Sequence, residues 1–380
     1  MTSASKCDSI RASTLRRPFL MEIGYFTMPL HPPGSNITQT LEDDLQQIVT
    51  LDEMGYKEAY IGEHFTFAWE NIPIPDLVIA QALGMTKNIV LGTGVHCLPN
   101  HNPMMLAHRV AQLDHMSKGR FHWGIGSSST PGDYEMFGFD PEVDDRRQYT
   151  RDAVDIILQI WDDPKPGLYE NKNWRFKIPE PVDDIGLTFH LTPYTKPHPP
   201  IAVGGVSPRS DTLIQAGERG WIPMSINLVN PATVATHWDA YEEGANNTGL
   251  TADRSIWRIA REVYVADTTE QARKEALEGV LRRDFEDYWF HLLSRGDGLQ
   301  HMKLDPDMAD SDLTIEYLMD NMWIVGSPDD VANKIRNLYH QVGGFGVLLA
   351  MGHEWEPKEQ WENSMRLLAD EVLPKLADLD

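Results

Sequence analysis

The stretch NIVLGTGVHCLPNHNPMMLAHRVAQLDHMSKGRFHWGIG, Asn88 to Gly126, contains two short apolar runs separated by a longer helical pattern. The first run, 88–95, predicts a strand, and the run 120–126 predicts a second one. Between them, residues 102–119 predict a helix that ends at a glycine. Because parallel strands need a crossover connection of this kind, the stretch predicts an α/β fold made of βα units.

The same alternation continues in both directions along the chain, from Met21 onward. The strand candidates lie at 21–26, 58–65, 88–95, 120–126, 200–205, 221–226, 256–266 and near 346–351. Helical patterns separate them. No Gly-x-Gly-x-x-Gly motif follows the first strand, so the pattern favours a (β/α)8 TIM barrel with insertions over a doubly wound sheet.

Three segments do not follow this alternation of strands and helices. Residues 1–20 are rich in Ser and Arg and predict a disordered N-terminal extension, which leaves 21–380 as a single barrel domain. Residues 162–199 are rich in Pro, Gly and charge and predict an excursion from the barrel that contains only short extended pieces. Residues 291–312 are polar and show no periodicity, so we expect a long loop there.

Composition excludes several classes of partner. The chain has 380 residues and a formal net charge of −24, which repels phosphate backbones and anionic lipid surfaces. We therefore expect neither a nucleic-acid partner nor a membrane partner. The apolar runs are shorter than the roughly 20 residues that cross a bilayer. Two cysteines, Cys7 and Cys97, do not make a disulfide framework and favour a reducing, cytoplasmic location.

Four potential metal ligands crowd the region after the third predicted strand: His96, Cys97, His101 and His108. His96 and Cys97 point to opposite faces of the strand, and His108 lies well inside the next helix, so the four side chains do not converge. Their spacing also matches no zinc motif, and we expect no metal site. A metal-dependent hydrolase built on His96 and His101 stays as an alternative.

The end of the second predicted strand carries Glu63 and His64. Active sites of such barrels lie at the carboxyl ends of the strands, where an imidazole can titrate near neutral pH and act as an acid or base. Glu63 could set the tautomer of His64, although adjacent side chains begin on opposite sides of a strand. The alternative is a histidine that is packed under a loop and bonded to the backbone.

A second candidate site is the sequence GGVSPRSDTLIQAGERG, in which a strand ends at Gly205 and a helix follows. Ser207, Arg209 and Ser210 lie just before the helix. Free N–H groups at a helix start, hydroxyl groups and one guanidinium are typical of a phosphate site. Serine and glycine are also ordinary residues at a helix N-terminus, so an unexceptional cap is the alternative.

The order of these pieces resembles the bacterial-luciferase-like flavin monooxygenases over nearly the whole chain from Met21. The matching motifs are Glu63-His64, GTGVHCLP, LDHMSKGRFHWGIG, IAVGGVSPRS, AGERG and VGSPDDV. The segment EHFTFAWENIPIPD, together with AGERGWIPMSI, resembles the branch that contains the diketocamphane and limonene monooxygenases.

This resemblance implies a two-component oxygenase. A separate NAD(P)H-dependent flavin reductase would supply reduced FMN, which reacts with O2 through a C4a-(hydro)peroxyflavin and oxygenates a small apolar substrate. Baeyer–Villiger insertion into a cyclic ketone and oxidation of a terpene-like alkene or hydrocarbon both fit. The alternatives are a deazaflavin-dependent hydride-transfer enzyme of the same fold and a non-catalytic flavin-binding subunit. The family also implies a homodimer.

The resemblance further implies roles for individual residues. His64 matches the active-site histidine of the family, with Glu63 beside it. Gly94 and Val95 match two residues that a cis peptide bond joins beneath the flavin ring. Ser207, Arg209 and Ser210 fall in the segment that holds the FMN phosphate. Residues 291–312 correspond to a mobile lid.

One motif departs from luciferase, which has a phosphate-binding arginine after its fourth strand. Here the same place reads GIGSSS, with Ser127 at the position of the arginine and Ser128 next to it. We therefore expect Arg209 to supply the charge that binds the phosphate. We expect apolar and aromatic residues at the barrel mouth, with His96 beside them, to line a dry substrate pocket: Phe26, Met28, Phe65, Trp69, Trp123, Tyr134 and Phe137.

Overall fold

The computed structural model describes residues 21–128, 130–140 and 142–379, so the predicted extension 1–20 lies outside the described residues. Parallel strands form a closed barrel, in which β3 pairs with β5 to complete the ring. The eight barrel strands are β1 (Glu22–Thr27), β2 (Glu58–Ile61), β3 (Val90–Thr93), β5 (Phe121–Gly126), β8 (Ile201–Gly205), β9 (Ile222–Ser225), β10 (Arg258–Arg261) and β13 (Val347–Gly352). The predicted TIM barrel is confirmed.

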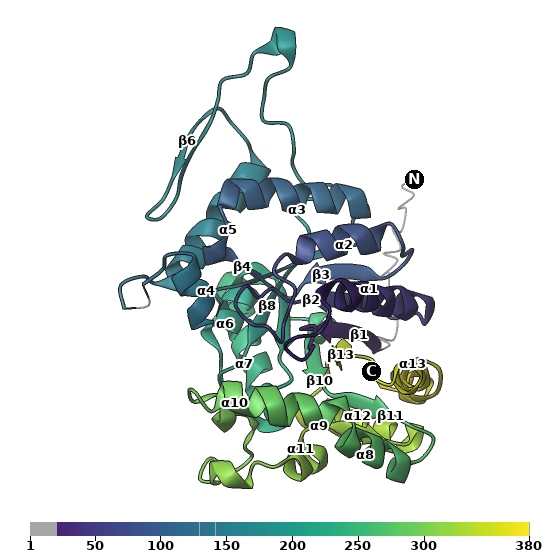
Figure 1. Cartoon of the computed structure of the whole chain (residues 1–380). Helices are drawn as coiled ribbons and strands as arrows, with labels where there is room; N and C mark the ends of the chain where they lie inside the picture. Colours follow the sequence, from purple (N-terminus) through teal and green to yellow (C-terminus); the bar gives the residue numbers. More distant parts are fainter. Residues whose placement is uncertain (1–20, 129, 141, 380) are drawn as a thin grey trace, which may run out of the picture.

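Helices cover the outside of the barrel (Figure 1). They are α1 (Ile37–Glu53), α2 (Pro75–Leu83), α3 (Pro103–Ser117), α4 (Pro131–Met136), α5 (Arg146–Asp162), α6 (Asp211–Arg219), α7 (Pro231–Thr248), α8 (Thr269–Glu278), α9 (Val280–Asp284), α10 (Phe290–Leu293), α11 (Ile315–Asn321), α12 (Pro328–Val342) and α13 (Lys358–Leu367). Side chains cap several of them; Asn102, for example, accepts a hydrogen bond from the Met105 N–H at the start of α3. In the described part of the chain, no helix has the length and apolar character that a membrane span requires.

Three predicted elements differ from the structure. The predicted strand 256–266 is two strands, because β11 (Val263–Val265) leaves the barrel and pairs with β12 (Ile324–Gly326) in a small separate sheet. The sequence from Thr269 predicts one long helix, but in the structure the helix is broken after α8, and a π-helical turn at Phe285–Trp289 lies between α9 and α10. The sequence predicts a further helix over about 143–161, but in the structure this helix, α5, begins at Arg146, after Asp145 caps it.

The predicted excursion 162–199 contains an antiparallel hairpin of β6 (Gly167–Glu170) and β7 (Arg175–Ile178). The hairpin and the loop after it project away from the barrel (Figure 1). The apolar run 187–191 predicts another extended piece, but it contributes only one isolated bridge, between Val182 and Leu187.

The bottom of the barrel, at the amino ends of the strands, is held by a buried ion pair. Arg258 of β10 donates from Nε and Nη2 to the two carboxylate oxygens of Glu58 on β2, each at 2.8 Å. Both side chains point inward, as does His122 of β5, which lies 2.8 Å from the Tyr60 hydroxyl. Burial and the Arg258 charge lower the pKa of His122 to about 4, although Glu58 opposes them. His122 is therefore neutral at pH 7.

Two barrel strands approach each other closely where β3 ends against β5. A Cβ atom at position 124 would lie 1.8 Å from the carbonyl oxygen of Thr93, so only glycine fits there. The Thr93 hydroxyl also donates to the Gly124 carbonyl at 2.8 Å. Beyond this point the chain forms a short second strand, β4 (His96–Cys97), which pairs with β5 in its turn. The GTG and WGIG motifs therefore bend the third strand at the barrel mouth.

We expect Gly124→Ala to lower the free energy of unfolding by about 3 kcal/mol or more, because the new methyl group overlaps backbone that cannot move aside. Gly204→Ala is the matched control on β8, since a Cβ there meets only Ile226 Cγ2, at 3.8 Å. Urea denaturation of both variants measures the difference. Equal stability of the two would contradict the contact between Thr93 and Gly124.

Candidate active site

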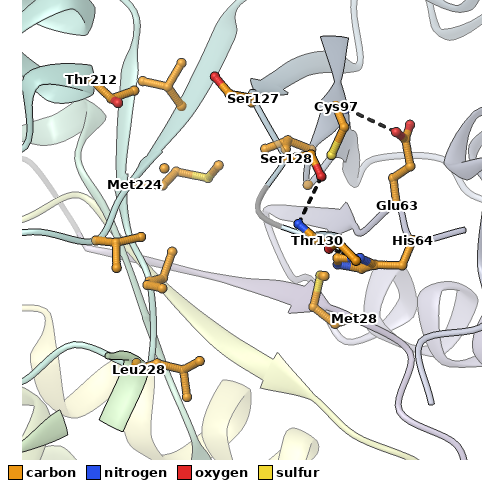
Figure 2. A pocket seen from close by; sticks show the side chains of 18 of the residues that line it. Met28, Glu63, His64, Cys97, Ser127, Ser128, Thr130, Thr212, Met224 and Leu228 are labelled. Carbon is orange, nitrogen blue, oxygen red and sulfur yellow. Dashed lines mark hydrogen bonds between the residues drawn. The ribbon is translucent and has the colours of Figure 1, made fainter. Parts of the chain in front are cut away.

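A cavity of about 1190 Å³ opens at the carboxyl ends of the barrel strands, where active sites of this fold lie. Glu63, His64, Thr130 and Met28 stand on one side of it, and Thr212, Met224 and Leu228 face them from the other (Figure 2). The predicted position of the site is therefore where the structure has its large cavity. The two ends of the cavity have different chemistry.

His64 lies at one end, on the loop after β2, and carboxylates contact both of its ring nitrogens. Its Nε2 is 2.9 Å from Glu70 Oε2. Its Nδ1 is 3.3 Å from the Thr130 hydroxyl and 3.8 Å from Asp133 Oδ2. The ring also stacks on Phe67, with 5.1 Å between the centroids. The imidazole is thus held on both edges and on one face.

These contacts determine the charge of His64. Burial by itself lowers the pKa of His64, but the attraction of Glu70 and the contacts with Asp133 outweigh burial and raise the pKa to about 10. The expectation that His64 titrates near neutral pH is therefore wrong, because the sequence pattern did not reveal either carboxylate. At pH 7 the ring is an imidazolium.

Glu63 points away from His64, and the expectation that it sets the His64 tautomer is wrong. Its Oε2 lies 2.8 Å from Nε2 of His101, and its Oε1 accepts a hydrogen bond from the Cys97 N–H at 3.2 Å. Glu63 and His101 are both buried. Although Glu63 lines the cavity, its contacts show that it anchors the segment 97–101 that follows the bent third strand.

His96 is fully buried and does not line the cavity, contrary to the expectation that it belongs to the substrate pocket. The Trp123 indole donates to its Nδ1 at 3.1 Å, so Nδ1 is an acceptor and Nε2 carries the proton. That Nε2 faces Asp76 Oδ1 at 3.2 Å. Each of the clustered histidines thus has its own carboxylate or backbone partner, and the described residues contain no group of three that could hold a metal ion.

Of the expected pocket residues, Phe26 and Met28 line the cavity. Phe65 and Phe137 instead stack edge to face on each other at 4.8 Å, and Trp69 stacks on Tyr288 at 5.4 Å. Tyr134 and Trp123 do not line the cavity either: Tyr134 lies under the Arg146 guanidinium, and Trp123 packs on Trp161. The cavity is lined by apolar residues that the sequence analysis did not name: Phe67, Trp221, Trp289, Leu292 and Leu293.

Some of the expected flavin-binding residues line the cavity and others do not. Gly94, Val95, Ser127 and Ser128 line the cavity, and the Gly94–Val95 peptide bond is cis, as the resemblance implies. Gly205, Ser207 and Ser210 do not line it. The neighbouring part of the chain instead contributes Gly204 of β8, Val206 of the loop, and Asp211, Thr212 and Gln215 of α6 to the cavity wall.

Arg209 lies outside the cavity lining, with its guanidinium on Glu243 of α7, so the expectation that it faces a phosphate site is wrong. The arginines at this end of the cavity are Arg147, Arg151 and Arg219. Arg219 pairs with Asp155 at 2.7 Å, whereas Arg147 has no carboxylate within 4 Å in the described part of the chain. Arg147 lies in the first turn of α5, where the helix dipole disfavours a cation. That unfavourable placement is the sequence signal that could have identified it.

The segment predicted as a lid forms part of the cavity lining. The residues that it contributes are His291, Leu292, Leu293, Arg295, Gly296, Asp297, Gly298 and His301. The helix before it contributes Asp287, Tyr288 and Trp289. The mobility of this segment stays a prediction.

A family model described as luciferase-like monooxygenase matches residues 21–345. This chain belongs to the luciferase-like monooxygenase family. The match confirms the resemblance that the sequence motifs indicated. The site described above, at the carboxyl ends of the strands, is thus the candidate active site of a family member.

Individual members of the luciferase-like family are similar over almost the whole chain. The 3,6-diketocamphane 1,6-monooxygenase of Pseudomonas putida is 32% identical over 373 residues, which cover 94% of this chain and 98% of that protein. The limonene 1,2-monooxygenase of Rhodococcus erythropolis is 31% identical over 361 residues, which cover 93% of this chain and 86% of that protein.

Solved structures show the same relationship. The oxygenating constituent of 3,6-diketocamphane monooxygenase from Pseudomonas putida, a type II Baeyer–Villiger monooxygenase in complex with FMN, superposes with a TM-score of 0.88 at 32% identity, covering 93% of this chain and 98% of that one. An F420-dependent secondary alcohol dehydrogenase shares the fold alone, with a TM-score of 0.67 at 17% identity and coverage of 94% and 100%.

We expect Glu63→Gln to lower the free energy of unfolding by about 3 kcal/mol, because it leaves the buried His101 without a charged partner. The matched control is Glu22→Gln, which breaks an exposed pair with Lys57 and should cost less than about 1 kcal/mol. Chemical denaturation compares the two. A Glu63 variant as stable as the Glu22 variant would contradict the anchoring role.

Proposed function

We propose that this protein is a flavin-dependent monooxygenase that uses reduced FMN and O2 to oxygenate a small apolar molecule. The observation that carries the proposal is the polarity of one cavity, with unpaired cationic charge at one end and a fixed imidazolium beside apolar walls at the other. A phosphorylated flavin has the matching shape, an anionic tail and a flat ring system.

The residues of the cavity fit FMN. Arg147, Ser127 and the start of α6 at Thr212 would hold the phosphate through charge-assisted hydrogen bonds and free N–H groups. Gly94 and Val95 would support one face of the ring system. Gly204 leaves the opposite wall open, because a side chain there would occupy the space. Bound reduced flavin would supply the activation of O2, while the surrounding residues bind it, orient it and exclude water.

The substrate would occupy the end near His64. Met28, Phe67, Trp289 and Leu292 make this part of the lining apolar, which favours a compact hydrocarbon skeleton. A cyclic ketone and a terpene-like alkene both have such a skeleton, and the related proteins are named for substrates of these two kinds. His64 would electrostatically stabilise the oxygen atom that acquires negative charge.

Two partners belong to this proposal. A separate NAD(P)H-dependent reductase would supply reduced FMN, since the similar Pseudomonas protein is described as the oxygenating constituent of its enzyme. A second copy of this chain would form a homodimer through α2 and α3, whose outer faces expose Leu77, Met105 and Met116. Sedimentation of the purified protein distinguishes a dimer from a monomer.

The proposed reaction is tested with ¹⁸O2, chemically reduced FMN and a panel of cyclic ketones and monoterpenes. We expect one labelled oxygen atom in the product, as a lactone from a ketone or as an epoxide or alcohol from a terpene. His64→Ala should reduce product formation roughly 100-fold and leave FMN affinity nearly unchanged, whereas His108→Ala on α3 should change neither. Reduction of the substrate by a reduced deazaflavin without oxygen incorporation would instead favour a hydride-transfer enzyme, and flavin binding with no product a non-catalytic subunit.

The phosphate end is tested by anaerobic titration with reduced FMN and reduced riboflavin. Arg147→Ala should raise the dissociation constant of FMN about tenfold or more and change that of riboflavin little, because riboflavin has no phosphate. Arg209→Ala is the matched control and should alter neither value. Equal losses for both ligands in the Arg147 variant would contradict the phosphate assignment.

A further inference from the structure

A chain of buried polar contacts joins His64 to the helix that precedes the lid segment. The Tyr288 hydroxyl donates to Oε1 of Glu70. The other carboxylate oxygen of Glu70, Oε2, lies 2.9 Å from Nε2 of His64. Glu70 is only 2% exposed and Tyr288 only 7%, so water does not compete for these contacts. Glu70 therefore has one oxygen for each partner.

The opposite edge of the imidazole is fixed from another element. Asp133, in the first turn of α4, has Oδ2 3.8 Å from Nδ1 of His64. Its Oδ1 accepts hydrogen bonds from the Thr66 hydroxyl at 2.6 Å and from the Phe65 N–H at 3.3 Å. Asp133 is thus unable to turn away without breaking both bonds, and the ring is clamped between two carboxylates.

Tyr288 depends on an irregular piece of helix for its position. It lies in the π-helical turn Phe285–Trp289, the kind of irregularity that is frequent at functional sites. Its ring stacks on Trp69 at 5.4 Å and meets Phe67 edge to face at 6.0 Å. The next residue, Trp289, lines the cavity. The same turn therefore contributes to the cavity wall and contacts the carboxylate that holds His64.

We propose that Glu70 and Tyr288 are positioning residues that hold the His64 imidazolium in one orientation through the close contact between Nε2 and Glu70 Oε2. The inference rests on the proposed function only where it concerns catalysis. Glu70, Asp133, Thr130 and Phe67 face the ring, and Tyr288 acts through Glu70. The cluster of one imidazolium and two carboxylates has a net charge of −1, so His64 serves as a fixed cation and not as a group that gains and loses a proton near pH 7.

The consequence for catalysis is a pH dependence with a definite sign. With both carboxylates present, the imidazolium persists to alkaline pH, so product formation should not vary with His64 ionisation between about pH 6 and 8. Glu70→Gln removes one negative charge and lowers the pKa of His64. The imidazolium is then lost as pH rises through the lower value, and product formation should fall on the alkaline side.

The test is an NMR titration of the histidine side chains in the ¹⁵N-labelled full chain, without flavin or substrate. In the wild-type protein we expect a slowly exchanging Nε2–H signal from His64, assigned by its loss in His64→Ala. Glu70→Gln should lower the His64 pKa by about one unit or more and abolish that signal. Tyr288→Phe keeps the aromatic ring but frees Glu70, so the signal should broaden by exchange with water.

Tyr264→Phe is the matched control, because Tyr264 donates an equivalent hydrogen bond to Glu275 at 2.9 Å and neither residue lines the cavity. It should leave the His64 signal and kcat unchanged, whereas Tyr288→Phe should lower kcat several-fold with little effect on KM. An unchanged His64 pKa in Glu70→Gln, or an unchanged signal in Tyr288→Phe, would overturn the proposal. If Glu70→Gln does not fold, the His64 signal in Tyr288→Phe tests the proposal by itself.

The NMR measurement tests the positioning of His64 independently of whether the protein is a monooxygenase. The NMR signals need no cofactor, so a protein that oxygenates nothing could still have a clamped His64. Conversely, oxygen incorporation with an unclamped His64 would retain the monooxygenase and reject the positioning residues.

Discussion

The contact between the Thr93 carbonyl and Gly124 is the constraint on which the site depends. Because a side chain at 124 would lie 1.8 Å from that oxygen, β3 and β5 come together only with glycine at this position. The third strand then bends, and β4 resumes pairing with β5 beyond the bend. The bend brings Gly94, Val95 and Cys97 to the cavity wall. Glu63 accepts a hydrogen bond from the Cys97 N–H and thereby holds this segment in place.

The two ends of the barrel use buried charge in different ways. At the bottom, Glu58 and Arg258 match each other in a bidentate pair, and each side chain satisfies the other. At the mouth, charges are unequal: Arg147 has no carboxylate partner in the described residues, and His64 has two. The paired charges at the bottom link two strands of the barrel. Buried charge without an equal partner is destabilising, and its presence at the mouth marks the end of the barrel that holds the candidate active site.

Periodicity and end-of-strand rules predicted the barrel, its connecting helices and the position of His64, because these depend on neighbours in sequence. They did not predict the partners of His64. Tyr288 and Glu70 are 218 positions apart, and no local pattern indicates that they meet. Arg209 was expected to bind the phosphate because it lies in a glycine- and serine-rich loop, yet a carboxylate on α7 pairs with it. The strands β10 and β11 are both apolar and adjacent in sequence, so the pattern predicts a single strand. In the structure, β10 pairs within the barrel and β11 pairs with β12.

The cavity therefore presents an electrostatic gradient that the protein maintains in spite of its own net charge of −24. An anionic group is attracted to the arginine end by charge that no side chain has neutralised, whereas at the other end two carboxylates offset the positive charge of His64. A ligand with one anionic terminus would enter in a single orientation and carry its neutral ring system toward His64. Orientation is thus set by two local departures from charge balance, while the apolar lining determines what fits between them.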